Sequence, residues 1–321
     1  MSAPFLELRE AIDRHIEAVV DSCPYPASLY DPIRYVMRVG GKRVRPLLVL
    51  LSARSLGDPG QAELDLAAAV ELLHTFTLVH DDIMDRDEMR RGQPTIHSRW
   101  DEGTAILAGD ALIGLAYRCL ARQDSPRLGE MIRTFTDAVV EVCEGQALDK
   151  EFEGRQVTLQ EYEDMIARKT GRLISMSARI GALAAGGDDL QADTLEQFGA
   201  SLGKAFQIQD DLLDYFSSTG ELGKAVGSDL AMHKATYATL KGRQLLTGEA
   251  GRRLEELLLS GTQAGMGEIR RLLQEGGVLE AGQRDVECLA AESRAALARV
   301  LAPERRAELE RFADWILNRT F

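Results

Sequence analysis

The stretch Glu71–Thr95, ELLHTFTLVHDDIMDRDEMRRGQPT, sets the expectation for the fold of this 321-residue chain. It opens as an apolar helix and reaches an aspartate trio of the pattern D-D-x-x-D, formed by Asp81, Asp82 and Asp85. At 3.6 residues per turn, Asp81 and Asp85 stack on one face with Asp82 beside them. The helix dipole is negative at this end and disfavours bare carboxylates. The pattern therefore predicts a compensating cation, and oxygen ligands suit a hard divalent ion.

The same pattern returns later in the chain. The segment QIQDDLLD places Asp210, Asp211 and Asp214 at the end of a second apolar helix, before a glycine-containing loop. One Asp-rich helix end is often only solvated, but six carboxylates that share a cavity repel one another unless cations neutralise them. Magnesium keeps several waters and takes one or two carboxylates together with phosphate oxygens. The two trios together predict a site where Mg²⁺ ions hold a polyphosphate.

Basic residues stand beside the acidic ones. The glycine loop GGKRVRP carries Lys42, Arg43 and Arg45, and the first trio is followed by Arg90 and Arg91. Taken singly, each is an ordinary surface charge or ion-pair partner. Taken together, they supply direct contacts to phosphate, which the Arg fork binds through two hydrogen bonds. Two cationic groups predict two anionic substrates, one bound through metal and one bound without it.

Composition favours an all-α protein, because Ala, Leu, Glu and Arg dominate while β-branched and aromatic residues are few. The chain is 45% hydrophobic and shows no linker-like run, so we expect a single domain over residues 1–321. The net charge of −13 without a basic stripe argues against a nucleic-acid partner.

The cysteines and the N-terminal segment indicate the cellular compartment of the protein. The four cysteines lie far apart without a C-x-x-C pair, which fits a reducing cytoplasm. The segment MSAPFLELREAIDRH is amphipathic and charged, unlike a signal peptide. No apolar run approaches the roughly 18 residues that a membrane span needs, so we expect a soluble, cytoplasmic protein.

Periodicity predicts a succession of helices. The segment from 104 to 120 is apolar almost all round, so we expect it to be buried or to face a second subunit. Thr158 and Glu161 form a predicted capping box at the start of another helix. The expected helices span 4–22, 28–39, 47–56, 61–85, 104–120, 125–152, 158–184 and 194–215, with further amphipathic helices from 238 to 321.

The motifs, in this order, resemble those of the polyprenyl synthetase family, the trans-isoprenyl diphosphate synthases. The set is GGKRVRP, HTFTLVHDDIMDRDEMRRG, GTAILAGDAL, EGQALD, KTG, FQIQDDLLD and GKAVGSD. The resemblance implies an all-α fold, a single large helical bundle of the isoprenoid synthase type with a central active-site cavity. It also implies a homodimer.

Site residues follow from the resemblance position by position. Both aspartate trios would bind three Mg²⁺ ions, which Mn²⁺ can replace, on the diphosphate of an allylic substrate. The same diphosphate would be contacted directly by Arg90, Lys169 and Lys224. The diphosphate of isopentenyl diphosphate would be held by Lys42, Arg45, His74 and Arg91. Thr170 and Gln207 would lie beside the allylic carbon. His233 stands where the family more often has glycine, so Lys234 is left out of the predicted site.

The implied reaction is the condensation of isopentenyl diphosphate with an allylic diphosphate (dimethylallyl, geranyl or farnesyl) by ionisation, condensation and proton elimination. Diphosphate leaves when its charge is neutralised in a dry site, and the allylic cation needs a pocket without water. Product length would be set by Phe76 and Thr77, five and four positions before Asp81. An aromatic there resembles enzymes that make the C20 geranylgeranyl product, with the C15 farnesyl product as the alternative.

Two other functions share parts of this pattern. A class I terpene cyclase has the helical fold and an Asp-rich motif but usually lacks a loop like GGKRVRP. A non-catalytic synthase subunit typically loses members of the trios, and all six aspartates are present here. Both features favour the chain-elongating enzyme.

Overall fold

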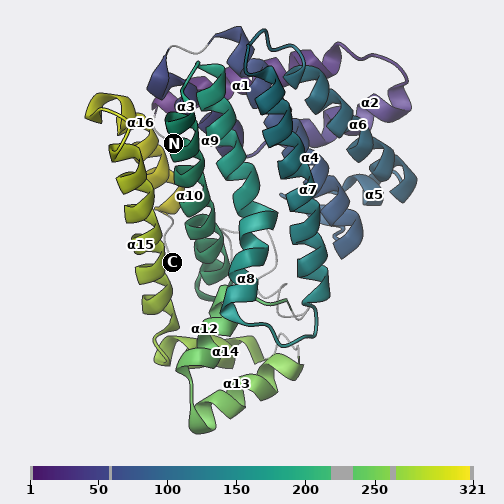
Figure 1. Cartoon of the computed structure of the whole chain (residues 1–321). Coiled ribbons are helices and arrows are strands. Elements are labelled where there is room, and N and C mark those ends of the chain that lie inside the picture. Colours follow the sequence, from purple (N-terminus) through teal and green to yellow (C-terminus); the bar gives the residue numbers. More distant parts are fainter. Residues whose placement is uncertain (1–2, 58–59, 218–233, 261–264, 319–321) are drawn as a thin grey trace. The chain divides into compact units, whose positions relative to one another are not determined.

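The computed structural model describes residues 3–57, 60–217, 234–260 and 265–318. Nearly all of these residues are helical (Figure 1), as the composition predicts. The contacts divide the chain into two compact units. Unit 1 comprises Met1–Val139, Leu173–Glu196 and Leu297–Arg311, and unit 2 comprises Val140–Arg172, Gln197–Ala296 and Phe312–Phe321.

Unit 1 is built on the first helices of the chain. Its elements are α1 (Ala3–Asp21), α2 (Ala27–Arg38), α3 (Val44–Leu56), α4 (Gln61–Asp85), β1 (Met89–Arg90), β2 (Gln93–Pro94), α5 (Ile96–Arg99), α6 (Glu102–Leu120) and α9 (Arg172–Ala184). Helices α7 (Leu128–Glu151), α10 (Asp189–Phe216) and α16 (Pro303–Leu317) contribute residues to both units.

Helix α4 is the centre of unit 1 and packs against α3, α6 and α1. Its residues from Leu66 to Leu73 are almost completely buried, as an apolar helix inside a core should be. Helix α6 reaches the length and the mean hydropathy, 1.3, of a membrane span. The expectation that no apolar run approaches that size was wrong for α6. Because α6 packs along α4 and α2, its apolar composition is that of a core helix.

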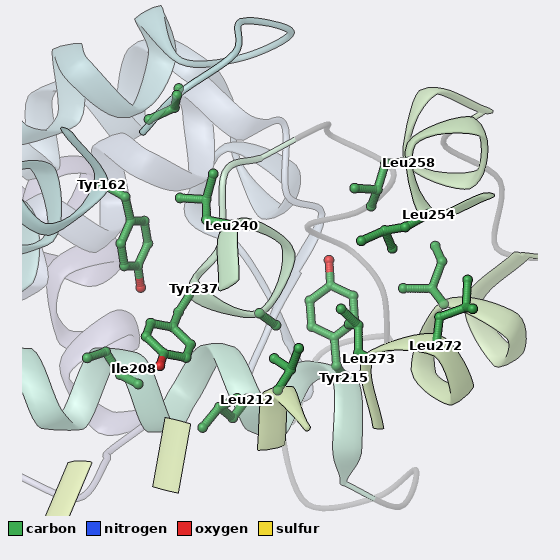
Figure 2. Close-up of a cluster of buried hydrophobic side chains, with 14 of the residues drawn as sticks. Tyr162, Ile208, Leu212, Tyr215, Tyr237, Leu240, Leu254, Leu258, Leu272 and Leu273 are labelled. Carbon is green, nitrogen blue, oxygen red and sulfur yellow. The ribbon is translucent and has the colours of Figure 1, made fainter. Parts of the chain in front are cut away.

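Unit 2 has a core of its own. Its remaining elements are α8 (Leu159–Ile166), the π-helical turn η1 (Ala167–Gly171), α12 (Tyr237–Leu245), α13 (Gly248–Ser260), α14 (Met266–Glu275) and α15 (Val278–Ala298). Helices α12, α13 and α14 lie together (Figure 1) and contribute Tyr237, Leu254 and Leu273 to a buried cluster. Figure 2 shows these side chains around Leu212 and Tyr215 of α10.

The predicted helix 61–85 and the capping box of Thr158 with Glu161 are both confirmed. Two local expectations were wrong. The loop GGKRVRP was expected to run to Pro46, but α3 begins at Val44, so Arg45 lies in the first helical turn. The segment 158–184 was expected to be one regular helix, but η1 interrupts it.

Candidate active site

The first aspartate trio ends helix α4 in unit 1. Asp81 and Asp85 are half-buried, whereas Asp82 is only 5% exposed. Arg90 donates from Nε to Asp82 Oδ1 at 2.6 Å. Burial raises the pKa of the Asp82 carboxyl to about 6, although Arg90 acts to lower it. The middle aspartate is thus held by the protein, while Asp81 and Asp85 keep part of their surface for a ligand.

A short hairpin carries the two arginines that follow this trio. Helix α4 ends at Asp85; the next residue, Arg86, has a left-handed φ of 56°, and Met89–Arg90 then pairs antiparallel with Gln93–Pro94. Arg91 and Gly92 form the turn with φ of 51° and 73°, which is the positive-φ geometry of tight hairpin turns. The sequence predicted only a helix break here. The hairpin fixes the backbone of Arg90 and Arg91.

Arg45 and His74 meet where α3 packs on α4. Arg45 Nη1 lies 3.0 Å from His74 Nε2. A guanidinium only donates, so Nε2 accepts and the imidazole proton is assigned to Nδ1. Burial, together with the charge of Arg45, holds the pKa of His74 well below its usual value. Burial also lowers the pKa of Arg45 to about 10, which leaves it charged at neutral pH.

Two buried N–H groups in this pair await an acceptor. Arg45 Nε and His74 Nδ1 have no hydrogen-bond partner among the residues that the structure describes. Leaving a buried donor unsatisfied costs about 1–3 kcal/mol. An oxyanion at this point would accept both bonds, and it would also be attracted by the guanidinium charge. The pair therefore has the chemistry of an anion site.

Arg43 has a different task from its neighbours in the glycine loop. It is 6% exposed and donates to Asp13 at 2.7 Å, to Glu71 at 2.6 Å and to the Met37 carbonyl at 3.0 Å. These bonds commit the guanidinium to the protein. Lys42, in contrast, is exposed. Sequence alone did not separate the two residues.

Arg91 closes against the same loop. Its Nη1 donates to the Gly40 carbonyl, and a Cβ added at Gly41 would lie 2.6 Å from that nitrogen. Glycine at 41 is therefore required for this approach. Arg90 and Arg91 line a cavity of about 30 Å³, which they share with Asp82.

Phe76 is a buried residue of α4. Its side chain is 8% exposed, and the edge of its ring meets His80 with the centroids 4.7 Å apart. A Cβ at Gly109 of α6 would lie 2.2 Å from His80 Nε2, so glycine makes room for the imidazole. Thr77 donates its hydroxyl to the His74 carbonyl at 2.8 Å. Phe76 therefore packs against an imidazole that Gly109 accommodates.

The second trio lies on α10 in unit 2 and is more deeply buried than the first. Asp210 is half-buried, while Asp211 and Asp214 are buried. Asp211 Oδ2 accepts from the Tyr162 hydroxyl and from the Tyr237 backbone N–H, each at 2.7 Å. Its Oδ1 accepts from Gln207 Nε2 at 2.8 Å. Here too, the middle aspartate accepts hydrogen bonds from the protein.

Thr170 and Gln207 are joined by a hydrogen bond. Thr170 Oγ1 donates to Gln207 Oε1 at 2.8 Å. Thr170 belongs to η1, and a Cβ at Gly203 of α10 would lie 2.7 Å from the Gly171 Cα. Two glycines thus let α10 approach η1 closely. Single π turns of this kind occur mostly at functional sites.

Asp149 lies in the motif EGQALD, and the sequence did not predict a role for it. It is 7% exposed, and its Oδ2 accepts from Lys169 Nζ at 2.5 Å. Lys234 Nζ lies 3.9 Å from the same oxygen. Lys234, which the prediction left out, therefore stands beside Lys169. Lys224, which the prediction included, lies outside the described residues.

The donor set in each unit suits a hard cation that brings other ligands with it. Within the described residues, no group of three His, Cys, Asp or Glu side chains is arranged to hold a metal ion. Each trio offers carboxylate oxygens with partial exposure, at Asp81, Asp85 and Asp210. Mg²⁺ fits such a set because it takes few carboxylates and fills its shell with water and phosphate oxygens.

Known proteins match this chain over most of its length. A family model described as polyprenyl synthetase matches residues 26–275. A short chain isoprenyl diphosphate synthase of Methanothermobacter thermautotrophicus is 43% identical over 258 residues, which are 79% of each protein. A farnesyl diphosphate synthase of Geobacillus stearothermophilus is 39% identical over 243 residues, which are 73% of this chain and 82% of that protein.

Solved structures agree with the sequence relatives. A geranylgeranyl pyrophosphate synthase matches all of this chain with a TM-score of 0.92 and 34% identity, over 100% of both chains. A polyprenyl synthase from Caulobacter crescentus CB15, complexed with calcium and isoprenyl diphosphate, matches with a TM-score of 0.89 and 30% identity over 98% of this chain and 97% of that one. The predicted all-α fold of the isoprenoid synthase type is confirmed.

Proposed function

Because the chain belongs to the polyprenyl synthetase family, we propose that it condenses isopentenyl diphosphate with allylic diphosphates up to C15 and accumulates all-trans geranylgeranyl diphosphate, C20. The protein is a trans-prenyltransferase of the short-chain type. The C20 product is favoured by Phe76, a large aromatic residue packed five positions before Asp81. The two units would work as one catalytic domain.

One observation carries the isopentenyl diphosphate site. Arg45 Nε and His74 Nδ1 are buried N–H donors that have no hydrogen-bond partner in the described part of the chain. Diphosphate oxygens would satisfy both donors. Lys42 and Arg91 would add charge to the same diphosphate. No carboxylate is needed at this anion, so it would be bound without metal.

The allylic diphosphate is proposed to be bound through metal. The family's structures include one complexed with calcium and isoprenyl diphosphate, and we propose three Mg²⁺ ions here, with Mn²⁺ as a substitute. The metal would be held by the carboxylates of Asp81, Asp82, Asp85, Asp210 and Asp214. When bound, the ions neutralise the charge that the leaving diphosphate develops.

Cationic side chains would complete this diphosphate site. Arg90 would contact the diphosphate from the hairpin, and Lys169 from η1. Lys234 joins Lys169 at Asp149 and is added on that ground. Lys224 is proposed on the resemblance alone. In the substrate-free protein, Arg90 and Lys169 bond Asp82 and Asp149, and the diphosphate would take over these donors.

Condensation needs a place where positive charge is tolerated. Thr170 and Gln207 present oxygen atoms that are already arranged by hydrogen bonds, and fixed dipoles stabilise charge without reorganisation. The double bond of isopentenyl diphosphate would attack the allylic carbon as the bond to diphosphate breaks. The new cation then loses a proton to the departing diphosphate, which restores the double bond.

The second candidate product is farnesyl diphosphate, C15. It is favoured by the 39% identity to a farnesyl diphosphate synthase. In this reading Phe76 would block the chain one isoprene unit earlier. Thr77, the smaller neighbour, leaves more room than an aromatic residue would at that position, which supports C20.

Assembly as a homodimer is proposed from an apolar stripe in unit 1. Ile106 and Leu107 of α6 are 42% and 62% exposed, and Ile132 of α7 is 39% exposed. Exposed apolar patches of this kind mark protein–protein contacts. In the part of the chain that the structure describes, no disulfide joins Cys23, Cys119, Cys143 or Cys288, which supports the cytoplasm as the compartment.

Incubation of the purified protein with Mg²⁺, isopentenyl diphosphate and each allylic primer in turn tests the proposed substrates. We expect isopentenyl diphosphate to be consumed with dimethylallyl, geranyl and farnesyl diphosphate, and consumption to stop when Mg²⁺ is chelated. Cyclised products, or consumption of the allylic diphosphate alone, would contradict the proposal.

A further inference from the structure

The middle aspartate of the second trio is fully engaged by the protein. Asp211 is 6% exposed, and both of its oxygens accept strong hydrogen bonds. Tyr162 donates its hydroxyl and Tyr237 its backbone N–H to Oδ2, each at 2.7 Å. Gln207 donates from Nε2 to Oδ1 at 2.8 Å. Its donors come from three elements, α8, α10 and α12.

The donors themselves depend on this carboxylate. Tyr162 is 1% exposed and Tyr237 also 1%, and both belong to the buried cluster of unit 2. Figure 2 shows the Tyr162 hydroxyl pointing toward the helix that carries Ile208 and Leu212. A metal ion on Asp211 would have to displace these donors and leave them buried without an acceptor. Asp210, in contrast, is half-buried and keeps part of its surface exposed.

We propose that Asp211 is a positioning residue that orients Gln207 and Thr170, and that it does not ligate metal. The proposal rests on the proposed function for the roles of Thr170 and Gln207 toward the allylic carbon. The hydrogen bonds that Asp211 accepts do not themselves depend on that function.

The hydrogen bonds of Asp211 set the orientation of Gln207, which in turn sets that of Thr170. A carboxylate only accepts, so Gln207 must turn its NH₂ group to Asp211. Its carbonyl Oε1 then faces Thr170, which lies 2.8 Å away. Thr170 must therefore donate its hydroxyl proton to Gln207. The lone pairs of Thr170 Oγ1 are left for a positive charge, which is the arrangement that an allylic cation requires.

The same carboxylate anchors the start of helix α12. Tyr237 is the first residue of α12, and its N–H is one of the donors that a helix leaves unsatisfied at its N-terminus. Negative charge is favoured there by the helix dipole. Lys234 lies three positions earlier, with Nζ 3.9 Å from Asp149. Asp211 thus also fixes where the chain delivers Lys234.

Replacement by asparagine separates a positioning residue from a ligand. In Asp211→Asn, the amide oxygen can still accept from Tyr162 and Tyr237, so the fold is kept. Its NH₂ group now faces Gln207, which must flip and present its own NH₂ group to Thr170. The hydrogen bond between Gln207 and Thr170 thereby changes direction. We expect kcat to fall about a hundredfold, the lower end of the loss that follows removal of one charge-stabilising group, with KM and the Mg²⁺ requirement changed less than twofold.

The matched control is Asp210→Asn, which should raise the Mg²⁺ concentration needed for half-maximal activity. A second readout needs no turnover. With EDTA present, Asp211→Ala should lower the melting temperature by several degrees because buried donors lose their acceptor, while Asp210→Ala should not. Calorimetric titration of Mg²⁺ in the presence of inorganic pyrophosphate should give the same affinity for Asp211→Asn and wild type.

The proposal is overturned if Asp211→Asn weakens Mg²⁺ binding as much as Asp210→Asn does, or if Asp211→Ala melts like wild type in EDTA. Wild-type protein that shows no turnover would instead remove the proposed function. The melting and calorimetric comparisons would still decide whether Asp211 is a positioning residue or a metal ligand.

Discussion

Arg45 Nη1 lies 3.0 Å from His74 Nε2, which joins the first turn of α3 to the middle of α4. The bond makes His74 an acceptor at Nε2 and keeps the ring neutral, because a protonated ring could not accept from a guanidinium. It also turns Nδ1–H and Arg45 Nε into a pair of buried donors. The proposed isopentenyl diphosphate site rests on this contact.

The pH dependence of protein stability should show that His74 is neutral in the folded protein. Burial holds its pKa in the folded protein well below 6.5, whereas the unfolded chain protonates it near that pH. The unfolded state therefore binds more protons below pH 6.5, and the free energy of unfolding should fall as the pH drops, by up to about 1.4 kcal/mol per pH unit. In His74→Gln, which keeps an acceptor for Arg45, this contribution is absent.

Urea unfolding of substrate-free protein between pH 7 and 5 provides the measurement. We expect the stability of His74→Gln to decline less steeply than that of wild type over this interval. Equal slopes for the two proteins would show that His74 ionises normally in the folded state.

Two cations of the glycine loop should have different roles, with Arg43 needed for stability and Lys42 for substrate binding. Arg43→Met leaves Glu71 buried without its partner and should lower the free energy of unfolding by about 3–5 kcal/mol. Lys42→Ala removes an exposed side chain and should leave stability within about 0.5 kcal/mol.

Steady-state kinetics complete that comparison. Lys42→Ala should raise KM for isopentenyl diphosphate roughly tenfold or more, the loss expected for a charged hydrogen bond. If Lys42→Ala destabilises the protein while Arg43→Met does not, the assignment of the two residues is reversed.

Phe76 should limit the length of the product. Phe76→Ala removes the ring that packs on His80, so products longer than that of wild type are expected by reversed-phase chromatography. The truncation also costs stability, about 3–5 kcal/mol for a buried Phe. Val79→Ala on the same helix serves as the control, because Val79 is buried at 2% exposure and is proposed to have no part in limiting the length of the product. A product of unchanged length from Phe76→Ala would remove Phe76 from this role.

Arg90 should be needed for its fork and not only for its charge. Arg90→Lys keeps the charge but cannot bind two oxygens in the same geometry, so kcat/KM for the allylic primer should fall roughly tenfold to a hundredfold. Arg86→Lys, an exposed position directly after α4, is the matched control and should behave like wild type. Equal kinetics for the two variants would exclude a diphosphate contact by Arg90.

Much of the fold could be predicted from sequence because long apolar periods dominate it. Helix α4 begins and ends at the predicted residues. The hairpin after α4 could not be predicted, since strands of two residues are too short to show an alternating pattern. The π turn η1 escaped for a different reason, because it depends on the close approach of Gly171 and Gly203 from distant parts of the chain.

The acidic and basic residues of the candidate site could be predicted, but their partners could not. Spacing within one helix indicates that Asp81 and Asp85 share a face. It gives no sign that Lys169 would bond Asp149, or that Tyr237 would donate its backbone to Asp211. These bonds join different elements, and only packing brings them together. The buried middle aspartates, Asp82 and Asp211, look like their neighbours in the sequence.

The chain length of the accumulated product tests the central proposal most directly. Purified wild-type protein would be incubated with Mg²⁺, dimethylallyl diphosphate and excess isopentenyl diphosphate, and the product identified by mass spectrometry after dephosphorylation. We predict that all-trans C20 accumulates. Accumulation of C15, or of C25 and longer products, would contradict the account.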